Sequence, residues 1–327
     1  MRLKKLLAAT LTLSLGLMTP FTGTVDATAK VESKILNVKP IRAEIDFIPN
    51  VVYAQVPTFD SPNTLLQMDI LQPQVKRPMP AVVFVTGGGF IAANRARLPQ
   101  LRMKLAESGY VVASITYRVA PNGRFPQPLE DVKSAIRFVK ANAQKFNVDA
   151  SRIVVVGDSA GGYLSAFAAA TNGSKQFNVG DNLNQSSEIL AAVDLYGLSD
   201  LSQVGADYSK ENQKMHHSAG ASEALWINGA TTFGGVDGGV LAHPEATAAA
   251  NPINYVDKNS APLLLMHGTS DRLVSPSQTD LVFQAYRAAG VESERYVIPG
   301  ADHADEYWVQ DNVLDLIVDW LDRHVKK

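Results

Sequence analysis

From residue 64 onward, short apolar runs alternate with longer amphipathic stretches along the chain. The segment 65–73 alternates apolar and polar side chains and ends at a proline, which is typical of a strand at or beside a sheet edge. We expect six further strands at residues 81–86, 111–117, 152–157, 189–196, 262–267 and 294–299. We expect helices at residues 100–108, 127–144, 161–171, 277–290 and 306–325. This alternation predicts an α/β fold, with a mostly parallel central sheet flanked by helices on both faces.

Two stretches break the alternation. Residues 30–50 show little periodicity, and we expect an extension there that leads into the first strands. Residues 199–258 are rich in glycine, alanine and serine and are too long for an ordinary loop. We expect a cap-like insertion there, near the carboxyl ends of the strands, where open parallel sheets bind their ligands.

The first residues have the pattern of a secretory signal peptide. Arg2, Lys4 and Lys5 precede an apolar run at 6–18, and Ala27-Thr28-Ala29 offers a cleavage site of small residues. The run is too short to span a bilayer comfortably, so an uncleaved membrane anchor is the weaker alternative. We therefore expect residues 1–29 to be removed, and residues 30–327 to form a single secreted, extracellular domain.

The bulk composition is that of an ordinary globular protein, with 46% hydrophobic and 19% charged residues. Its 327 residues are enough to bury one sizeable core. The absence of cysteine excludes disulfides and lipid attachment through a cysteine. The net charge of −2, with no basic run, argues against a nucleic-acid groove, and the lack of a second long apolar stretch argues against a membrane span. We expect small-molecule or polymer partners, and nothing in the pattern indicates the oligomeric state.

The strongest chemical signal is Gly157-Asp158-Ser159-Ala160-Gly161, which follows a β-branched run and opens a stretch of small residues. A serine on a sharp turn from strand to helix exposes its hydroxyl in a strained backbone conformation. The residues two positions before and two positions after this serine must be as small as glycine to avoid collisions. The pattern therefore predicts a nucleophile elbow with Ser159 as the nucleophile.

A serine nucleophile needs a base, and the base needs a third group that orients it. His303 follows the last expected strand, and Asp271 follows the strand at 262–267. The chain order Ser159, Asp271, His303 is the order found in α/β-hydrolases. The other five histidines fall in the insertion, at a strand end or in the last helix: His216, His217, His243, His267 and His324. We therefore expect His303 to be the base and Asp271 the acid.

Two rival assignments carry less weight. Asp302 and Asp305 lie closer to His303 along the chain, but near neighbours rarely fold back to align with the imidazole N–H. His216 and His217 make a weak metal pair, because ligand-type residues are sparse around them and adjacent histidines point different ways on regular structure. We expect no metal and no other cofactor.

The glycine run at 87–89, directly after the strand at 81–86, is suited to an oxyanion hole. Glycines let the backbone approach the substrate carbonyl, and backbone N–H groups need no reorganisation to stabilise the developing charge. We assign the donors to Gly88, Gly89 and Ala160, the last being the residue after the nucleophile.

Three aromatic residues are candidates for substrate contact: Phe90 beside the glycine run, and Trp226 and Phe233 in the insertion. Their rings would stack on an aryl acyl group or a sugar face. The sequence leaves open the alternative that Trp226 and Phe233 form the small core of the insertion itself.

Together these residues resemble the α/β-hydrolase fold, and more narrowly the esterases of the hormone-sensitive-lipase-like and bifunctional acetylxylan/feruloyl esterase-like groups. The likeness covers residues 64–325 and, besides 157–162, includes Tyr-Arg-Val-Ala-Pro at 117–121, Phe125-Pro126, Asp131, the segment 250–256 and Gly290-Val291-Glu292. The resemblance implies the same triad and oxyanion loop. Thr86 stands where the family usually has histidine, and Asn122 stands where the lipase-like branch commonly has glutamate.

The predicted signal peptide and triad indicate a secreted serine esterase that acts through an acyl-enzyme. The resemblance implies short acyl or aromatic esters as its substrates, for instance acetyl or feruloyl esters of plant polysaccharide. A general carboxylesterase or lipase acting on small lipophilic esters is the alternative within the same chemistry. A serine peptidase of the prolyl-oligopeptidase kind carries an added domain that this chain lacks. A non-catalytic binding protein built on the same fold usually lacks a triad member.

Overall fold

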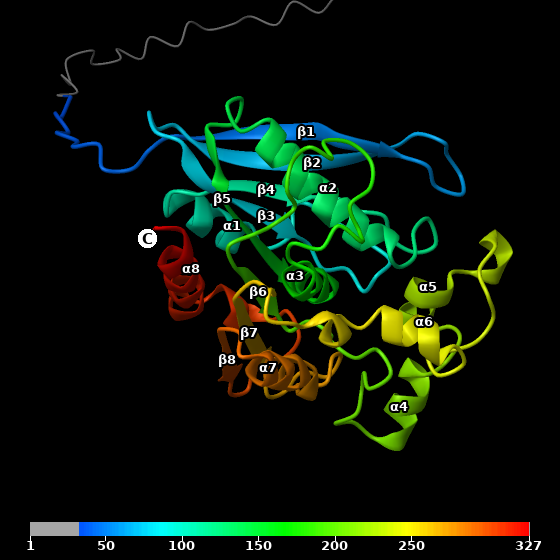
Figure 1. The fold of residues 1–327 in the computed structure, drawn as a ribbon. Coiled ribbons are helices and arrows are strands. Elements are labelled where there is room, and N and C mark those ends of the chain that lie inside the picture. The colour runs from blue at the N-terminus through cyan, green and yellow to red at the C-terminus, as the bar shows by residue number, and fades with distance from the viewer. Residues whose placement is uncertain (1–32, 327) are drawn as a thin grey trace, which may run out of the picture. The chain divides into compact units, whose positions relative to one another are not determined.

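The computed structural model describes residues 33–326, and the predicted signal peptide at 1–29 lies outside them. The chain divides into a unit that ends at Ile41 and a compact unit that begins at Arg42. The second unit is built on an eight-stranded sheet of order β1-β2-β4-β3-β5-β6-β7-β8 (Figure 1). The strands are β1 (Ile45–Val56), β2 (Thr64–Pro73), β3 (Met79–Val85), β4 (Val111–Ile115), β5 (Val148–Asp158), β6 (Ala192–Leu195), β7 (Leu263–Gly268) and β8 (Ser293–Ile298).

The pairs β1–β2 and β2–β4 are antiparallel, and the other strand pairs are parallel. The central strands are buried on both faces, because side chains of β3 alternate between two hydrophobic clusters. One cluster lies under α2 (Gln127–Ala141), α3 (Ala160–Ala170) and α7 (Ser277–Ala289), and the other under α1 (Pro99–Glu107) and α8 (Asp311–Val325) (Figure 1). The predicted α/β fold with helices on both faces is confirmed.

Two elements differ from the expectation. Strand β1 was not expected, because its alternation is interrupted by register shifts between Ile48 and Val51 and between Val52 and Ala54. The helix expected over residues 306–325 is instead the short 3₁₀ helix η3 (Glu306–Val309) followed by α8, with a break at the extended residue Gln310. Neither difference moves a residue of the candidate site.

The segment 199–258 joins β6 to β7 and holds α4 (Lys210–His216), α5 (Ser222–Asn228) and α6 (Pro244–Ala249), with the 3₁₀ helices η1 (Thr231–Phe233) and η2 (Pro252–Tyr255). Its three α-helices gather beyond one end of the sheet (Figure 1).

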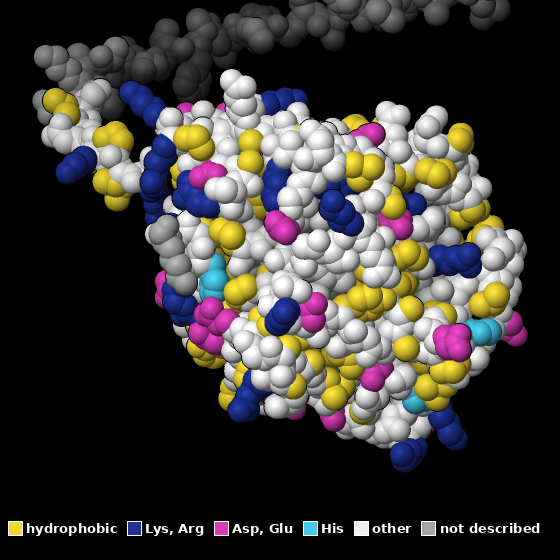
Figure 2. Space-filling view, in the orientation of Figure 1, with side chains coloured by type: hydrophobic (Ala, Val, Ile, Leu, Met, Phe, Trp, Pro, Cys, Tyr) yellow, Lys and Arg dark blue, Asp and Glu magenta, His cyan; other side chains and the backbone are white. Residues whose placement is uncertain are grey.

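On the face seen in Figure 2, basic and acidic side chains are interspersed, so this face offers no extended basic surface. Within residues 33–326, no helix is both long and apolar enough to cross a bilayer.

Asp194 in the middle of β6 is fully buried beneath the start of α3. Burial raises the pKa of Asp194 to about 8, and the hydrogen bond that its Oδ1 accepts from the Gly197 N–H (2.8 Å) offsets this only in part. Its Oδ2 has no hydrogen-bond partner among the described residues. The native state therefore binds a proton that the unfolded chain releases, and the stability of the fold must fall as pH rises from about 4 to about 8.

Replacing Asp194 by asparagine is expected to flatten this pH dependence, because the amide keeps the acceptor for Gly197 and does not ionise. The melting temperature of the wild-type protein should fall more between pH 5 and pH 9 than that of Asp194→Asn, by several degrees. Thermal unfolding followed by circular dichroism measures both slopes. Asp319→Asn, a change at an exposed position of α8, is the control and should leave the wild-type slope in place. Equal slopes for wild type and Asp194→Asn would contradict the prediction.

Candidate active site

Ser159 lies between the end of β5 and the start of α3 and has a left-handed backbone, with φ 52° and ψ −122°. A non-glycine residue in this region is strained, typically by about 1–3 kcal/mol, and persists only where its surroundings enforce it. The flanking glycines are required by contact: a Cβ on Gly157 would collide with the Gly161 carbonyl, and a Cβ on Gly161 with the Val85 carbonyl. The turn thus has the geometry of the predicted elbow.

Ser159, His303 and Asp271 form one hydrogen-bonded chain at the carboxyl ends of β5, β8 and β7. The Ser159 Oγ lies 2.9 Å from His303 Nε2, and His303 Nδ1 lies 2.8 Å from Asp271 Oδ2. All three side chains are largely buried, the imidazole being 11% exposed. In this arrangement His303 donates its Nδ1–H to the carboxylate and presents Nε2 as an acceptor to the serine hydroxyl.

The Asp271 carboxylate is held on both oxygens. Its Oδ1 accepts the N–H groups of Leu273 and Val274, both at 2.9 Å, and its Oδ2 lies 3.1 Å from His267 Nε2 as well as against His303. Burial alone would raise the pKa of Asp271, but the hydrogen bonds from His267 and His303 outweigh it and hold this pKa well below its ordinary value. Asp271 is therefore a carboxylate throughout the neutral range.

The glycine run expected to form the oxyanion hole lies against the nucleophile, since a Cβ on Gly87 would come within 2.9 Å of the Ser159 Cβ. Within residues 33–326, the N–H groups of Gly88 and Gly89 donate to no protein acceptor, while the neighbouring Gly88 carbonyl is held by the N–H groups of Ile91 and Ala92. Ala160 is the first residue of α3, where N–H groups have no acceptor within the helix. These three donors therefore remain available to a substrate oxygen.

Comparison with known proteins identifies the group to which this arrangement belongs. The sequence model of the BD-FAE family matches residues 68–286. The chain belongs to the BD-FAE family. Esterase LipC of Mycobacterium tuberculosis is 31% identical over 246 residues, which are 75% of this chain and 57% of LipC. A probable isoprenylcysteine alpha-carbonyl methylesterase, ICMEL1 of Oryza sativa subsp. japonica, is 27% identical over 69% of this chain and 51% of its own length.

The chain thus spans little more than half the length of these relatives. Among solved structures, a truncated form of a carbohydrate esterase from gut microbiota is similar, with a TM-score of 0.73 and 28% identity over 86% of this chain and 97% of that one. The α/β-hydrolase fold and the resemblance to esterases, a carbohydrate esterase among them, are therefore confirmed.

The motifs that carry the BD-FAE resemblance support the oxyanion loop. The Tyr117 hydroxyl donates to the Thr86 carbonyl (2.7 Å), which immediately precedes the glycine run. The next residue, Arg118, forms a buried ion pair with Asp131, with its Nη2 2.7 Å from Oδ1, and donates its backbone N–H to the same carboxylate. The Thr86 hydroxyl is buried without a partner among the described residues, so threonine does not replace the hydrogen bonds of the family's histidine.

Asp158, the residue before the nucleophile, holds the oxyanion loop from the other side. Its buried Oδ1 accepts the Gly87 N–H at 2.8 Å, and its Oδ2 accepts from Arg97 Nη2 at 2.9 Å. This carboxylate therefore joins the elbow, the glycine run and the segment that leads into α1. No feature of the sequence pointed to Arg97. Asp158 occupies a variable position of the Gly-x-Ser-x-Gly motif, so the motif gave it no role.

Replacing Asp158 by asparagine is expected to lower kcat by about 10- to 100-fold with little change in KM. The amide retains one acceptor oxygen, so either Gly87 or Arg97 loses its partner and the loop shifts away from the geometry that stabilises a transition state. The loss should stay below the ~10²–10³-fold that follows removal of an oxyanion donor itself. Steady-state kinetics with a p-nitrophenyl ester measure it.

Asp149→Asn is the matched control for this prediction. Asp149 also lies on β5 and pairs with an arginine, Arg152 (2.7 Å), but near the other end of the strand. Its kcat should stay near the wild-type value. A wild-type kcat in Asp158→Asn would show that the carboxylate does not control the loop.

Tyr196 and His267 also contact the site, and neither was predicted from the sequence. The Tyr196 ring packs edge-on against the His303 ring, with centroids 4.8 Å apart, and its backbone has a positive φ of 46°. His267 is fully buried, and its Nε2 faces both Asp271 Oδ2 and the Val274 carbonyl (3.0 Å), which makes it a donor to both. The one feature of the sequence that could have pointed to them is their position at the ends of predicted strands, where parallel sheets bind their ligands.

Among the described residues, the rival candidates form no hydrogen bond with the side chains of the triad. Asp302 pairs with Arg272, and Asp305 accepts the Asp302 N–H, so neither carboxylate bonds to the His303 ring in the described chain. His216 and His217 bond to different groups, Glu223 Oε1 and the Ser202 carbonyl.

The expectation of substrate contact needs correction for two of the three aromatic residues. The Trp226 side chain has no exposed surface, and it packs on Phe90 (centroids 4.4 Å apart) and donates towards the Tyr163 hydroxyl at 3.3 Å. Phe90 is 2% exposed. Both residues belong to the core that joins the insertion to the sheet, because their packed rings fill the space between the insertion and the sheet. Phe233 is about half exposed and lies on the surface of the insertion.

Proposed function

We propose that this protein is a serine carboxylic-ester hydrolase that acts on short acyl or aromatic esters through an acyl-enzyme. The observation that supports it most is the unbroken chain from the Ser159 Oγ through both nitrogens of His303 to Asp271 Oδ2. Membership of the BD-FAE family supports the same reaction.

The reaction follows from the positions of these groups. His303 Nε2 takes the hydroxyl proton as the Ser159 Oγ attacks the ester carbonyl carbon, and Asp271 stabilises the imidazolium that forms. The carbonyl oxygen becomes an oxyanion that accepts hydrogen bonds from Gly88, Gly89 and Ala160. Collapse expels the alcohol, which takes the proton from His303. Water then attacks the acyl-enzyme by the same steps, releases the acid and restores the serine.

For the substrate, we propose acetyl or feruloyl esters of plant polysaccharide. The similarity to a carbohydrate esterase at 28% identity over almost the whole of that structure supports this choice. A second candidate, a general esterase of small lipophilic esters, is favoured by the likeness to an isoprenylcysteine methylesterase.

A panel of esters separates these candidates. p-Nitrophenyl esters from acetate to palmitate, run beside acetylated xylan and methyl ferulate, should give the highest kcat/KM on acetate among the chain lengths and clear release of acid from xylan or ferulate. A maximum on long chains with no reaction on xylan or ferulate would favour the lipophilic alternative. No hydrolysis of any ester would overturn the proposal.

We also propose that the protein is secreted and that its mature chain starts at Lys30, because small residues precede that position and polar residues follow it. N-terminal sequencing of material from the culture medium is expected to begin at or within a few residues of Lys30. Recovery of an intact Met1 in a membrane fraction would instead support an uncleaved anchor.

A further inference from the structure

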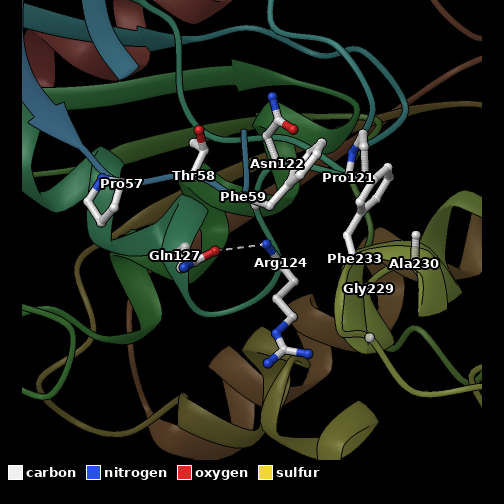
Figure 3. A pocket seen from close by; sticks show the side chains of 12 residues that line it. Pro57, Thr58, Phe59, Pro121, Asn122, Arg124, Gln127, Gly229, Ala230 and Phe233 are labelled. Carbon is white, nitrogen blue, oxygen red and sulfur yellow. Dashed lines mark hydrogen bonds between the residues drawn. The ribbon is translucent and has the colours of Figure 1, made fainter. Parts of the chain in front are cut away.

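A cavity of about 290 Å³ lies where the insertion meets two loops of the sheet (Figure 3). Three segments form its walls: the loop between β1 and β2, the loop that precedes α2, and the loop that follows α5. This volume is at the lower end of the range for ligand pockets, which suits one small cyclic unit rather than a long chain.

Two walls of the cavity are attached to Phe90, the residue that follows the oxyanion glycines. The Phe90 carbonyl accepts the Ala120 N–H at 2.9 Å, and the next residue, Pro121, lines the cavity. On the other wall, Trp226 packs on the Phe90 ring, and the chain then leads to Gly229 at the rim. These contacts fix two walls of the cavity to the residue that directly follows the oxyanion donors.

The cavity has an apolar side made by a pair of aromatic rings. Phe59 from the β1–β2 loop stacks on Phe233 of the insertion, with centroids 3.9 Å apart and an angle of 22° between the ring planes. Phe59 is 49% exposed and Phe233 is 47% exposed, which is unusual for two large side chains that are already stacked. Such exposed rings suit the C–H face of a sugar ring.

The opposite side carries an arginine that pairs with no acidic side chain among the described residues. The side chain of Arg124 extends from its loop towards Gly229 (Figure 3), and its guanidinium forms no ion pair with any carboxylate of residues 33–326. Gln127 accepts the Arg124 backbone N–H with its Oε1 (3.1 Å), which leaves its NH₂ group as a donor. A guanidinium recognises a carboxylate through two parallel hydrogen bonds.

We propose that this cavity binds a hexuronic acid unit of the polysaccharide that carries the ester. The pyranose face would lie on the Phe59 and Phe233 pair, and the carboxylate would pair with Arg124. This inference rests on the proposed function for its substrate, and it adds a charge requirement that a neutral xylan or a simple aryl ester does not meet.

The activity test uses two acetylated xylo-oligosaccharides that differ only in one glucuronic acid side group. The wild-type protein should have a kcat/KM about tenfold higher on the acidic oligosaccharide. Arg124→Gln should remove this preference while leaving the neutral oligosaccharide and p-nitrophenyl acetate unchanged, and Arg124→Lys should keep part of it. Asp60→Asn should increase the preference, because the Asp60 carboxylate lies at the rim, 3.4 Å from the Asn122 amide.

Two matched controls separate the cavity from general effects on charge and packing. Arg77→Gln removes an exposed arginine near the amino end of β3, and Phe47→Ala removes a 58% exposed ring on β1. Both should keep the wild-type preference. The proposal is overturned if the wild-type protein does not distinguish the two oligosaccharides, or if Arg124→Gln and Arg77→Gln change the ratio equally.

Binding is measured separately, so that the proposed function and this inference fail independently. The full chain with Ser159→Ala, titrated with the deacetylated acidic and neutral oligosaccharides in a calorimeter, should bind the acidic one about tenfold more tightly. Loss of that difference on adding Arg124→Gln supports the cavity even if no ester is hydrolysed. Equal affinity for both oligosaccharides, or tighter binding of free ferulate than of the uronic acid, overturns it.

Discussion

Replacing Ser159 by alanine is expected to lower kcat on the order of 10⁶-fold, the loss seen when a serine nucleophile is removed from an intact triad. Alanine retains the Cβ at the strained position, so the elbow, the glycine contacts and the fold should remain. The residual rate would come from the oxyanion donors and from substrate binding alone. The measurement is hydrolysis of p-nitrophenyl acetate, together with labelling by a fluorophosphonate, which should be lost.

Ser165→Ala is the control for loss of a buried hydroxyl near the elbow. Its Oγ donates to the Gly161 carbonyl (2.8 Å) within α3 and does not reach His303. This variant should keep both the wild-type kcat and the labelling. If Ser159→Ala retained more than a few per cent of the wild-type kcat at an unchanged melting temperature, another group would have to be the nucleophile.

The sequence was most informative where a steric or chemical constraint acts between residues that are only a few positions apart in the chain. The elbow is such a case, because the glycines at 157 and 161 are required by contacts within one turn and with the adjacent strand. His303 and Asp271 could be selected because each follows an apolar run, and ends of parallel strands meet at one edge of the sheet.

The sequence was least informative where a contact joins distant segments. His267 was not selected, because it falls at a strand end, yet its Nε2 faces the same oxygen of Asp271 that His303 does. The Arg97 pair with Asp158 and the Phe59 stack on Phe233 bring together residues from separate loops, and no periodicity marks such pairs. The burial of Trp226 depended in the same way on Phe90, which lies far away along the chain.

The environment of Asp271 leads to the second large expected effect. Its two oxygens have distinct roles: Oδ1 accepts two backbone N–H groups, and Oδ2 accepts from the imidazoles of His303 and His267. In Asp271→Asn, the amide oxygen must stay towards the N–H groups of Leu273 and Val274, because an NH₂ group there would face two donors. The NH₂ group then faces His303 Nδ1, which has to become an acceptor.

This reversal places the imidazole proton of His303 on Nε2, facing the serine hydroxyl, so that Ser159 has no base. Asp271→Asn is therefore expected to lower kcat by roughly 10⁴-fold, the magnitude for the corresponding change in serine proteases, with little change in KM.

The matched control is Asp302→Asn. Asp302 is next to His303 in the chain, but its carboxylate pairs with Arg272 and accepts the His303 backbone N–H, and it does not touch the ring. This variant should keep kcat within a few-fold of wild type. If Asp302→Asn caused the large loss and Asp271→Asn did not, the orienting acid would be the neighbour in sequence, and the hydrogen bond of 2.8 Å between Asp271 and His303 would have no part in catalysis.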